Sequence, residues 1–350
     1  MIDVSHRLRR AAGTFALAAV ILAASEPARA QDASLIAAAT KEGEVVWYAT
    51  LVRNQAARPL ADAFERKYPG IKVRLHTGTQ SDVLLKILDE GRTGSPRVDV
   101  SHGGSAVGSL MRAGLLEHFI PAAAAHYPPA YKDPDGYWTG EVLSFLVAAV
   151  NTETVRPEDE PRTYQDLLEP KWRGKIAWST QMTQGGPPGF IGTVLQSMGQ
   201  DAGMQYLRQL SQQQIVNVPA NQRVVLDQVM AGQYPLALMT FNNHSEISAK
   251  KGAPIKWLKI EPVTATADAI FLIKNAPHPN AGKLFIEFAL SSEGQTVFRN
   301  ADYIPADPST PARTASLKPE TGNFKTVVLS PKLVEEKLSD WIRIYNELFK

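Results

Sequence analysis

The sequence predicts an α/β protein made of two Rossmann-like lobes. About 320 residues follow an N-terminal apolar segment, which is more than one hydrophobic core usually holds. Short apolar runs alternate with amphipathic helical patterns, and the rhythm begins again after residue 145. Such alternation is typical of a mostly parallel sheet with helices on both faces, so we expect two lobes of this class.

Residues 1–30 have the composition of an export signal. Arginines between positions 7 and 10 precede a 14-residue apolar run from Ala11 to Ala24, and Ala28-Arg29-Ala30 gives the small-x-small pattern of a signal peptidase site. The alternative is a membrane-anchor helix, but spanning a bilayer takes about 20 apolar residues. We therefore expect cleavage after Ala30 and a soluble protein in the periplasm.

Composition excludes several classes of function. The chain has 37 Lys+Arg and 35 Asp+Glu, but residues 1–30 carry four arginines and two acids, which leaves 33 residues of each sign. A net charge near zero does not suit nucleic-acid binding. The absence of cysteine excludes disulfides, thiolate metal sites, cysteine nucleophiles and a lipid-bearing cysteine. Because no metal-binding or phosphate-binding motif occurs, we expect no metal, no cofactor and no catalytic residue.

The first lobe opens with a strand, a helix and a second strand. Residues 44–48 are an apolar run, and residues 58–68 place Leu60 and Phe64 on one helical face before Pro69-Gly70 ends the helix. The further elements expected in this lobe are strands at 71–75 and 98–100 and a helix at 81–90.

The second lobe repeats the alternation after residue 145. The expected strands are 175–178, 215–218 and 236–240, and the expected helices are 190–198, 201–210 and 222–230. Open parallel sheets bind ligands in the crevice outside the carboxyl ends of their strands. The turns at those ends are rich in Thr, Ser, Asn, Gln, Gly and His, and they lie at 49–53, 76–82, 101–105, 179–189, 220–222 and 241–246. The sequence therefore predicts a site for a small polar ligand, aided by helix N-termini.

Polar residues of the first-lobe turns are candidates for lining this crevice. Thr79 and Ser81 have the alternative of simple helix caps, and Tyr48 that of a core aromatic. His102-Gly103-Gly104-Ser105 resembles an oxyanion-loop motif, but the residues around Ser105 miss the G-x-S-x-G spacing of a nucleophile. The candidates are Tyr48, Thr77, Thr79, Gln80, Ser81, His102 and Ser105.

The second lobe offers two further groups of candidates. Residues 180–186 form a small-residue loop, in which glycine would let backbone amides approach a ligand, or else a plain connection. Arg223 begins a helix and could pair with a carboxylate or phosphonate in two parallel hydrogen bonds, or else be a solvated surface arginine. The candidates here are Thr180, Gln181, Gln184, Asn221 and Arg223.

Several phrases give the chain a family resemblance. They are GEVVWYA at 43–49, FERKYPGIKV at 64–73, PRTYQDLLEPKWRGKI at 161–176, and NAPHPNA at 275–281 followed by SSEGQ at 291–295. In this order, over nearly the whole mature chain, the sequence resembles the type 2 periplasmic solute-binding proteins of ABC importers. The matching branch includes ferric-ion receptors and relatives that bind organic ligands.

The resemblance implies two lobes with mixed central sheets, joined by a hinge that the chain crosses near 143–151 and 260–272. Residues 31–145 with 270–350 would form lobe 1, and residues 146–269 would form lobe 2. The lobes would close on one ligand, and an inner-membrane ABC permease would receive it. The resemblance also implies a monomer.

The family's binding loop departs from the ferric pattern here. Ferric-binding relatives carry adjacent tyrosines after the strand at 235–240, whereas this chain has Phe241-Asn242-Asn243-His244. Phenolates suit Fe(III), and neutral amides do not. The resemblance therefore implies that Asn242, Asn243 and His244, with Tyr303 near the hinge, face a small and anionic organic ligand. The alternative in the same family is Fe(III) held by His, Asn or Tyr with a bound anion.

A secreted hydrolase is the competing hypothesis of another class. It would use Ser105 with a histidine, and the loop at 102–105 is its only motivation.

Overall fold

The computed structural model describes residues 26–350, with side chains from Ala33 onward. Most of the expected export signal, including the run from Ala11 to Ala24, lies outside these residues, and cleavage after Ala30 stays a prediction. Between Glu26 and Lys350, no helix is long and apolar enough to cross a membrane.

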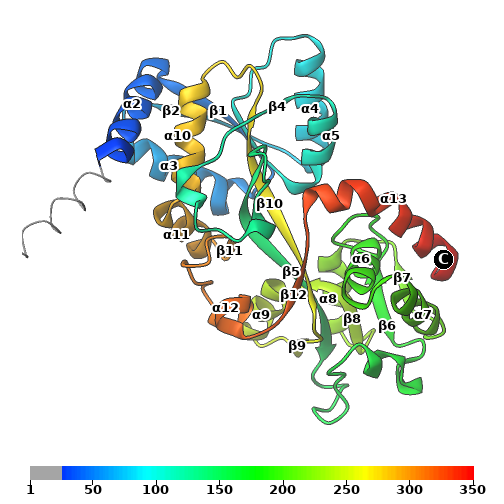
Figure 1. The fold of residues 1–350 in the computed structure, drawn as a ribbon. Coiled ribbons are helices and arrows are strands. Elements are labelled where there is room, and N and C mark those ends of the chain that lie inside the picture. The colour runs from blue at the N-terminus through cyan, green and yellow to red at the C-terminus, as the bar shows by residue number, and fades with distance from the viewer. Residues whose placement is uncertain (1–25) are drawn as a thin grey trace, which may run out of the picture.

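One continuous mixed sheet of 12 strands runs through the described part of the chain (Figure 1). The order is β2-β1-β3-β10-β5-β8-β6-β7. Both ends of the sheet are parallel, whereas β10 and β5 run antiparallel to each other and to β3 and β8 beside them. The strands are β1 Glu44–Ala49, β2 Lys72–Thr77, β3 Val100–His102, β4 Leu116–Glu117, β5 Thr139–Asn151, β6 Ile176–Ser179, β7 Val216–Val218, β8 Leu236–Phe241, β9 Ile255–Leu258, β10 Val263–Ile273, β11 Ile304–Pro305 and β12 Thr326–Leu329.

Helices pack around this sheet, and local sequence explains where several of them begin. Thr79 and Asp82 form a capping box at the start of α4, and Ser330 caps α13 through the amide of Leu333. The helices are α2 Glu26–Glu42, α3 Arg58–Lys67, α4 Gln80–Arg92, α5 Val107–Arg112, α6 Pro187–Met198, α7 Gln200–Ser211, α8 Gln222–Met230, α9 Asn242–Lys250, α10 Pro279–Leu290, α11 Ser292–Asn300, α12 Pro319–Gly322 and α13 Pro331–Leu348.

The expected elements overlap the observed ones, with β3 the clearest displacement. The sequence placed that strand at 98–100, but it spans Val100–His102. Asp99 explains the shift, because its carboxylate accepts the amide of Val46 at 2.7 Å and its own amide donates to the carbonyl of Val46. The ladder pairing with β1 therefore begins at Val100, after this polar clamp.

Buried apolar side chains gather in separate clusters at the two ends of the molecule. Trp47, Phe64 and Phe285 lie in one large cluster, and Trp178 and Phe190 lie in another. The long strands β5 and β10 run from one body to the other (Figure 1). This arrangement supports the mixed-sheet, two-lobed architecture.

The C-terminal helix departs from the expected division of the chain. Residues 270–350 were assigned to lobe 1, yet Trp341 and Ile344 of α13 belong to the cluster that contains Trp178. The ring of Phe349 also packs against that of Trp178, with centroids 5.0 Å apart. The apolar face of α13 is buried against α6. Residues 329–349 therefore pack mainly with the second body (Figure 1).

Candidate functional site

The carboxyl ends of β1 and β3 meet at one edge of the sheet. The two strands are parallel neighbours, with Trp47 opposite Val100. Just beyond them, Oγ1 of Thr50 lies 2.9 Å from Nδ1 of His102. The turns after these strands therefore form one surface, at the position where open sheets bind ligands.

His102 is buried against a second titratable side chain. It is 2% exposed, and its Nε2 lies 3.5 Å from Oε2 of the fully buried Glu141 on β5. His102 Nε2 and both carboxylate oxygens of Glu141 have no hydrogen-bond partner. Burial lowers the pKa of His102, and burial together with the charge of Asp268 raises the pKa of Glu141 well above 4.5. Both shifts favour the uncharged forms.

A β-bulge places Glu141 at this edge. Asp268 on β10 pairs with Val142, while the next residue, Ala269, pairs with Gly140. Glu141 is thus the extra residue of β5, and bulges commonly re-aim a side chain next to a binding site.

Asp268 is the partly exposed neighbour of this buried pair. Its Oδ1 accepts the amide of Gly104 at 3.4 Å. A Cβ on Gly104 would stand 2.7 Å from the carbonyl oxygen of Ala267, so glycine permits this close approach of loop and strand. Among the ion pairs of residues 33–350, no lysine or arginine pairs with Asp268 or Glu141. We call Asp268, Glu141 and His102 the acidic corner.

Tyr303 lies beside the acidic corner, as its expected place near the hinge implies. Its hydroxyl accepts the amide of Val52 at 3.2 Å, and the following strand β11 pairs with β5. Burial and the charge of Asp268 raise the pKa of Tyr303, although the bond from Val52 opposes the rise.

The turn after β2 lies next to the turn after β1, since Thr77 pairs with Ala49. Thr79 follows the capping alternative, because its hydroxyl lies 2.7 Å from Oδ2 of Asp82 and accepts the amide of Asp82 at 3.2 Å. Ser81 is exposed on the first turn of α4.

Ser105 is paired with an amide side chain. Its hydroxyl donates to Oε1 of Gln80, and both residues are exposed. His102 contacts Thr50 and Glu141 instead. Ser105 and His102 are therefore each bonded to other side chains and not to each other.

Tyr48 corrects one of the candidates. It is 4% exposed, lies among the apolar side chains under α4, and donates its hydroxyl to Oε1 of Glu90 at 2.7 Å. Burial and this hydrogen bond raise its pKa. The core-aromatic alternative describes Tyr48, because its side chain is buried and its hydroxyl bonds to Glu90 near the C-terminal end of α4.

Backbone amides of the loop at 180–186 donate hydrogen bonds to other groups of the protein. The amide of Thr180 donates to Val218, that of Gln181 to the hydroxyl of Ser179, and that of Gly186 to Thr183. Pro187 and Pro188 then begin α6 without amide hydrogens. The expected approach of glycine amides to a ligand is therefore not formed at Gly186, although the side chains of Thr180, Gln181 and Gln184 remain at least partly exposed.

Asn221 and Arg223 begin α8. Asn221 is exposed and caps the helix, with Oδ1 accepting the amide of Val224 at 3.0 Å. Arg223 pairs with Asp227 at 2.8 Å and donates to the hydroxyl of Ser248 on α9 at 3.2 Å. Its side chain is 45% exposed, so part of the guanidinium stays available to a ligand.

The binding loop after β8 splits into a structural and an accessible part. Asn242 is fully buried and donates to the carbonyl of Leu317 at 2.9 Å, which corrects its assignment to the crevice. Asn243 is partly exposed and donates to the carbonyl of Asp302 at 3.3 Å. His244 is partly exposed, its Nδ1 has no hydrogen-bond partner, and burial and nearby Arg223 lower its pKa.

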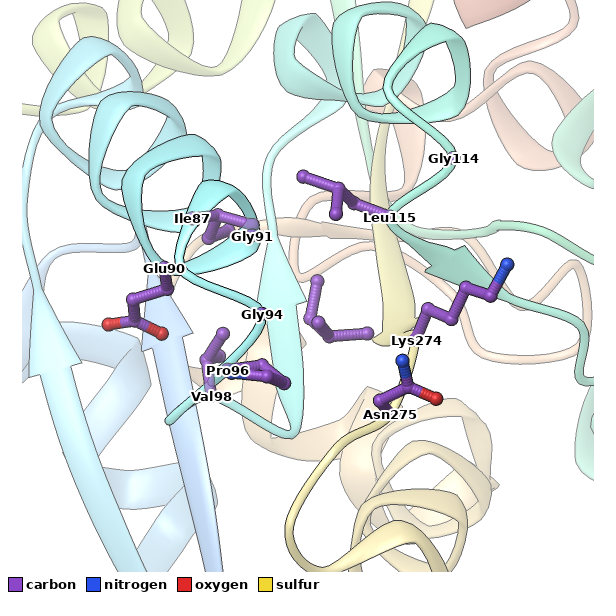
Figure 2. Close-up of a pocket in the computed structure, with 11 residues that line it drawn as sticks. Ile87, Glu90, Gly91, Gly94, Pro96, Val98, Gly114, Leu115, Lys274 and Asn275 are labelled. Carbon is purple, nitrogen blue, oxygen red and sulfur yellow. The ribbon is translucent and has the colours of Figure 1, made fainter.

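Three cavities of the described residues lie outside the turns of the acidic corner, and one of them, of about 480 Å³, lies in the second body beside Lys171 and Trp172. One of about 210 Å³ is enclosed by α4, the loop before β3 and the end of β10, with Glu90, Lys274 and Asn275 around it (Figure 2). It lies at the amino end of β3, opposite His102. Another of about 290 Å³ lies between α9 and the segment 302–317, and is lined by Asn243 and Tyr303 among others. Residues 33–350 contain no group of three or more His, Cys, Asp or Glu that could hold a metal ion.

Comparison with known proteins decides what this architecture represents. Residues 94–327 match the bacterial extracellular solute-binding protein family. The chain belongs to this family. The solute-binding protein is 22% identical over 272 residues to the Fe(3+)-binding periplasmic protein of Serratia marcescens, covering 75% of this chain and 78% of that one.

Other similar proteins of this class have different ligands in their names. The solute-binding protein is 28% identical over 274 residues to a putative 2-aminoethylphosphonate-binding periplasmic protein of Salmonella paratyphi A, covering 73% of this chain and 78% of that one. A Trichodesmium structure with iron and citrate ligands matches its fold with a TM-score of 0.74 at 20% identity, covering 88% of this chain and all of that one. The fold and the solute-binding class are therefore shown.

The sequence analysis missed Thr50, Glu141 and Asp268. Thr50 lies inside the expected turn at 49–53, so the turn rule located it without singling it out. Glu141 and Asp268 stand in long apolar strands, and a carboxylate in such a run was the available signal.

Proposed function

We propose that this chain captures a small organic ligand between its two lobes in the periplasm and delivers it to an inner-membrane ABC permease. The observation that carries the proposal is the pair of polar strand-end surfaces, one at Thr50 and His102 and the other at Arg223 and His244, in bodies joined by β5 and β10. In this reading lobe 1 is residues 31–145 with 270 to about 328, and lobe 2 is residues 146–269 with the C-terminal helix. The exported form begins after Ala30 and acts as a monomer, without enzymatic turnover and without nucleic acid.

The proposed mechanism is a population shift between open and closed arrangements. A ligand that contacts both lobes binds the closed arrangement more tightly and thereby favours it. The permease then recognises the closed outline. The crossing strands β5 and β10 are the parts of the chain that must adjust, because they connect the two bodies.

The second-lobe surface favours an anionic group on the ligand. Arg223 supplies a positive charge, and its guanidinium suits the two oxygens of a carboxylate or phosphonate. The start of α9 adds the partial positive charge of a helix N-terminus beside Asn243 and His244. The relative named for 2-aminoethylphosphonate supports an organic anion of this kind.

Fe(III) is the second candidate, supported by the names of the Serratia and Trichodesmium proteins. Against it stand Phe241 and Asn242 in the loop where adjacent tyrosines were expected for a ferric receptor. The hydroxyl of Tyr48 is bonded to Glu90, so it is not free to bind iron. Asn242 is fully buried, and its amide oxygen is a neutral ligand that suits Fe(III) poorly.

Thermal unfolding of residues 31–350, stripped of ligand by unfolding and refolding, tests the proposal. The panel contains phosphonates, phosphate esters, carboxylates, amines, sugars and Fe(III)-citrate. A ligand at about 100 times its Kd stabilises by roughly 2.7 kcal/mol, which shifts the midpoint by several degrees. Solution scattering with the stabilising ligand should then show a more compact particle. The absence of any shift together with an unchanged scattering profile contradicts the proposal, and a shift with Fe(III)-citrate alone replaces the organic ligand with iron.

A further inference from the structure

The acidic corner has the wrong charge for the anionic end of a ligand. Asp268 is its only partly exposed member. The groups around Asp268 are the amide of Gly104, the hydroxyl of Tyr303, and the side chains of His102 and Glu141, whose pKa shifts favour their uncharged forms. No lysine or arginine among residues 33–350 pairs with these carboxyls. An anion placed here would meet a like charge in a partly desolvated site, which is unfavourable.

Glu141 has no structural partner that would account for its burial. Its side chain is fully buried, and both carboxylate oxygens lack a hydrogen-bond partner. An unsatisfied buried polar group costs about 1–3 kcal/mol, and more if it is charged. The bulge on β5 nevertheless places this side chain beside His102, at the turn where a ligand is expected. A binding role explains why this cost is retained.

A metal ion does not fit the corner well. No group of three or more possible ligands is assembled in residues 33–350. Asp268 also has one carboxylate oxygen already engaged by the amide of Gly104. An ammonium group needs only one carboxylate and a few neutral acceptors, and Thr50 with Tyr303 supplies hydroxyl oxygens close by.

We propose that the acidic corner binds an ammonium group, so that the ligand is an amine-bearing zwitterion with its ammonium on Asp268 and its anionic end on the lobe that carries Arg223. This inference rests on the proposed function, and it assigns the lobe-1 half of the same site. Asp268 contacts the ammonium directly. Glu141 does not contact the ammonium and gains negative charge when the cation binds at Asp268.

Proton release follows from this arrangement. The titratable groups facing Glu141 are His102 on β3, Asp268 on β10 and Tyr127, whose pKa burial and the charges of Asp307 and Glu141 raise. A cation bound at Asp268 favours the carboxylate form of Glu141, because opposite charges stabilise ionisation. Binding of an amine should therefore release protons, whereas binding of an amine-free anion should not.

Titration calorimetry with matched probes tests the inference. The pairs are 2-aminoethylphosphonate with ethylphosphonate, phosphoethanolamine with ethyl phosphate, and 4-aminobutyrate with butyrate. We expect at least one amine to bind about tenfold or more tightly than its amine-free partner. The binding enthalpy of that amine should vary between buffers of different ionisation enthalpy over the pH range from 4.5 up to the folded pKa of Glu141, and this variation measures the protons released.

Two variants separate binding from folding. Asp268→Asn keeps an acceptor for the amide of Gly104 and should weaken the amine about tenfold or more, with the amine-free partner changed by less than about threefold. Glu141→Gln should abolish the buffer dependence while the protein stays folded. Asp89→Asn on the exposed side of α4, where the Asp89 side chain is 76% exposed, is the matched control and should change neither quantity.

The outcomes distinguish the inference from the proposed function. Equal binding of both members of every pair, or an equal loss of both in Asp268→Asn, overturns the ammonium site and leaves the receptor standing. Binding of amine-free anions alone, or of Fe(III) alone, likewise overturns the ammonium site and leaves the receptor proposal standing. A chain that binds none of the probes and does not respond to the wider panel contradicts both.

Discussion

The ring of Trp341 on α13 lies against Gly192 on α6, where a Cβ would stand 2.7 Å from Cη2 of the indole. Trp341 is 2% exposed. The helices thus approach more closely than any residue with a side chain at position 192 allows. This contact fixes the C-terminal helix on the second body, and Glu335 of the same helix also pairs with Arg112 on α5. One helix therefore touches both bodies.

Removing either side of the Gly192–Trp341 contact should destabilise the protein. Trp341→Ala should cost about 3–5 kcal/mol of unfolding free energy, since it empties a large buried volume. Gly192→Ala should cost about 1–3 kcal/mol through overpacking, and less in a Trp341→Phe background with a smaller ring. Urea unfolding measures both. Arg343→Ala is the control, because its side chain is 71% exposed, and a loss in that variant as large as in Trp341→Ala would contradict the packing argument.

Asp307 should stabilise the protein in a pH-dependent way. Burial opposes its ionisation, but hydrogen bonds from Thr310, Ser309 and His126 outweigh that and hold its pKa at about 2. A carboxyl with a lowered pKa contributes stability above the unfolded pKa of 3.8, and that stability is lost as the pH falls toward 2.

Asp307→Asn should therefore lose about 1–2 kcal/mol at pH 6, and the difference from the native protein should shrink by pH 3. Urea titrations at both pH values measure this. Asp135→Asn, at an exposed position, is the control. A difference in the free energy of unfolding that stays constant with pH would show that the charge of Asp307 contributes nothing to stability.

Glu141 should give the opposite slope. Its pKa in the folded protein lies above 4.5, so the folded state holds a proton that the unfolded state loses as the pH rises past that value. This group's contribution to stability therefore falls with rising pH between 4.5 and its folded pKa. In urea unfolding without ligand, the free energy of unfolding of Glu141→Gln should therefore increase relative to that of the native protein as the pH rises above 4.5. Parallel stability curves would place the carboxyl in its ionised form instead.

Arg223→Gln should weaken anionic ligands by about tenfold or more while changing stability by less than about 1 kcal/mol. The small stability effect follows because its pair with Asp227 is largely exposed, at 45% and 49%. Calorimetry with whichever anion shifts the unfolding midpoint measures the affinity. Arg208→Gln, on the exposed side of α7, is the control, and an equal loss in both variants would point to general electrostatics.

The exported protein should begin at Gln31. Mass spectrometry of the periplasmic fraction from cells expressing the full chain checks this, because cleavage after Ala30 removes residues 1–30. Retention of those residues in a membrane fraction would favour the anchor alternative.

Local sequence was sufficient for much of the fold. Apolar periodicity located β1, α3 and α8, because a strand or helix is read from neighbours a few residues apart. The same patterns placed the turns after β1 and β3, and hence the edge at which Thr50 meets His102.

Residue type alone did not decide which polar side chains face the crevice. Tyr48 and Asn242 stand in or next to the expected turns, yet their polar atoms bond to Glu90 and Leu317, which are distant in sequence. Thr79 satisfies its own helix. Only tertiary packing shows which hydrogen bonds are already made inside the protein.

The sequence by itself determined the α/β class, the two-lobed rhythm and the strand ends where a ligand is expected. The tertiary structure decided that Glu141 and Asp268 meet His102, and that α13 packs on α6. The physical reason is range. Periodicity and capping act within a turn or a strand, whereas the acidic corner depends on three strands pairing in one register with a bulge at Glu141, and no local pattern carries that register.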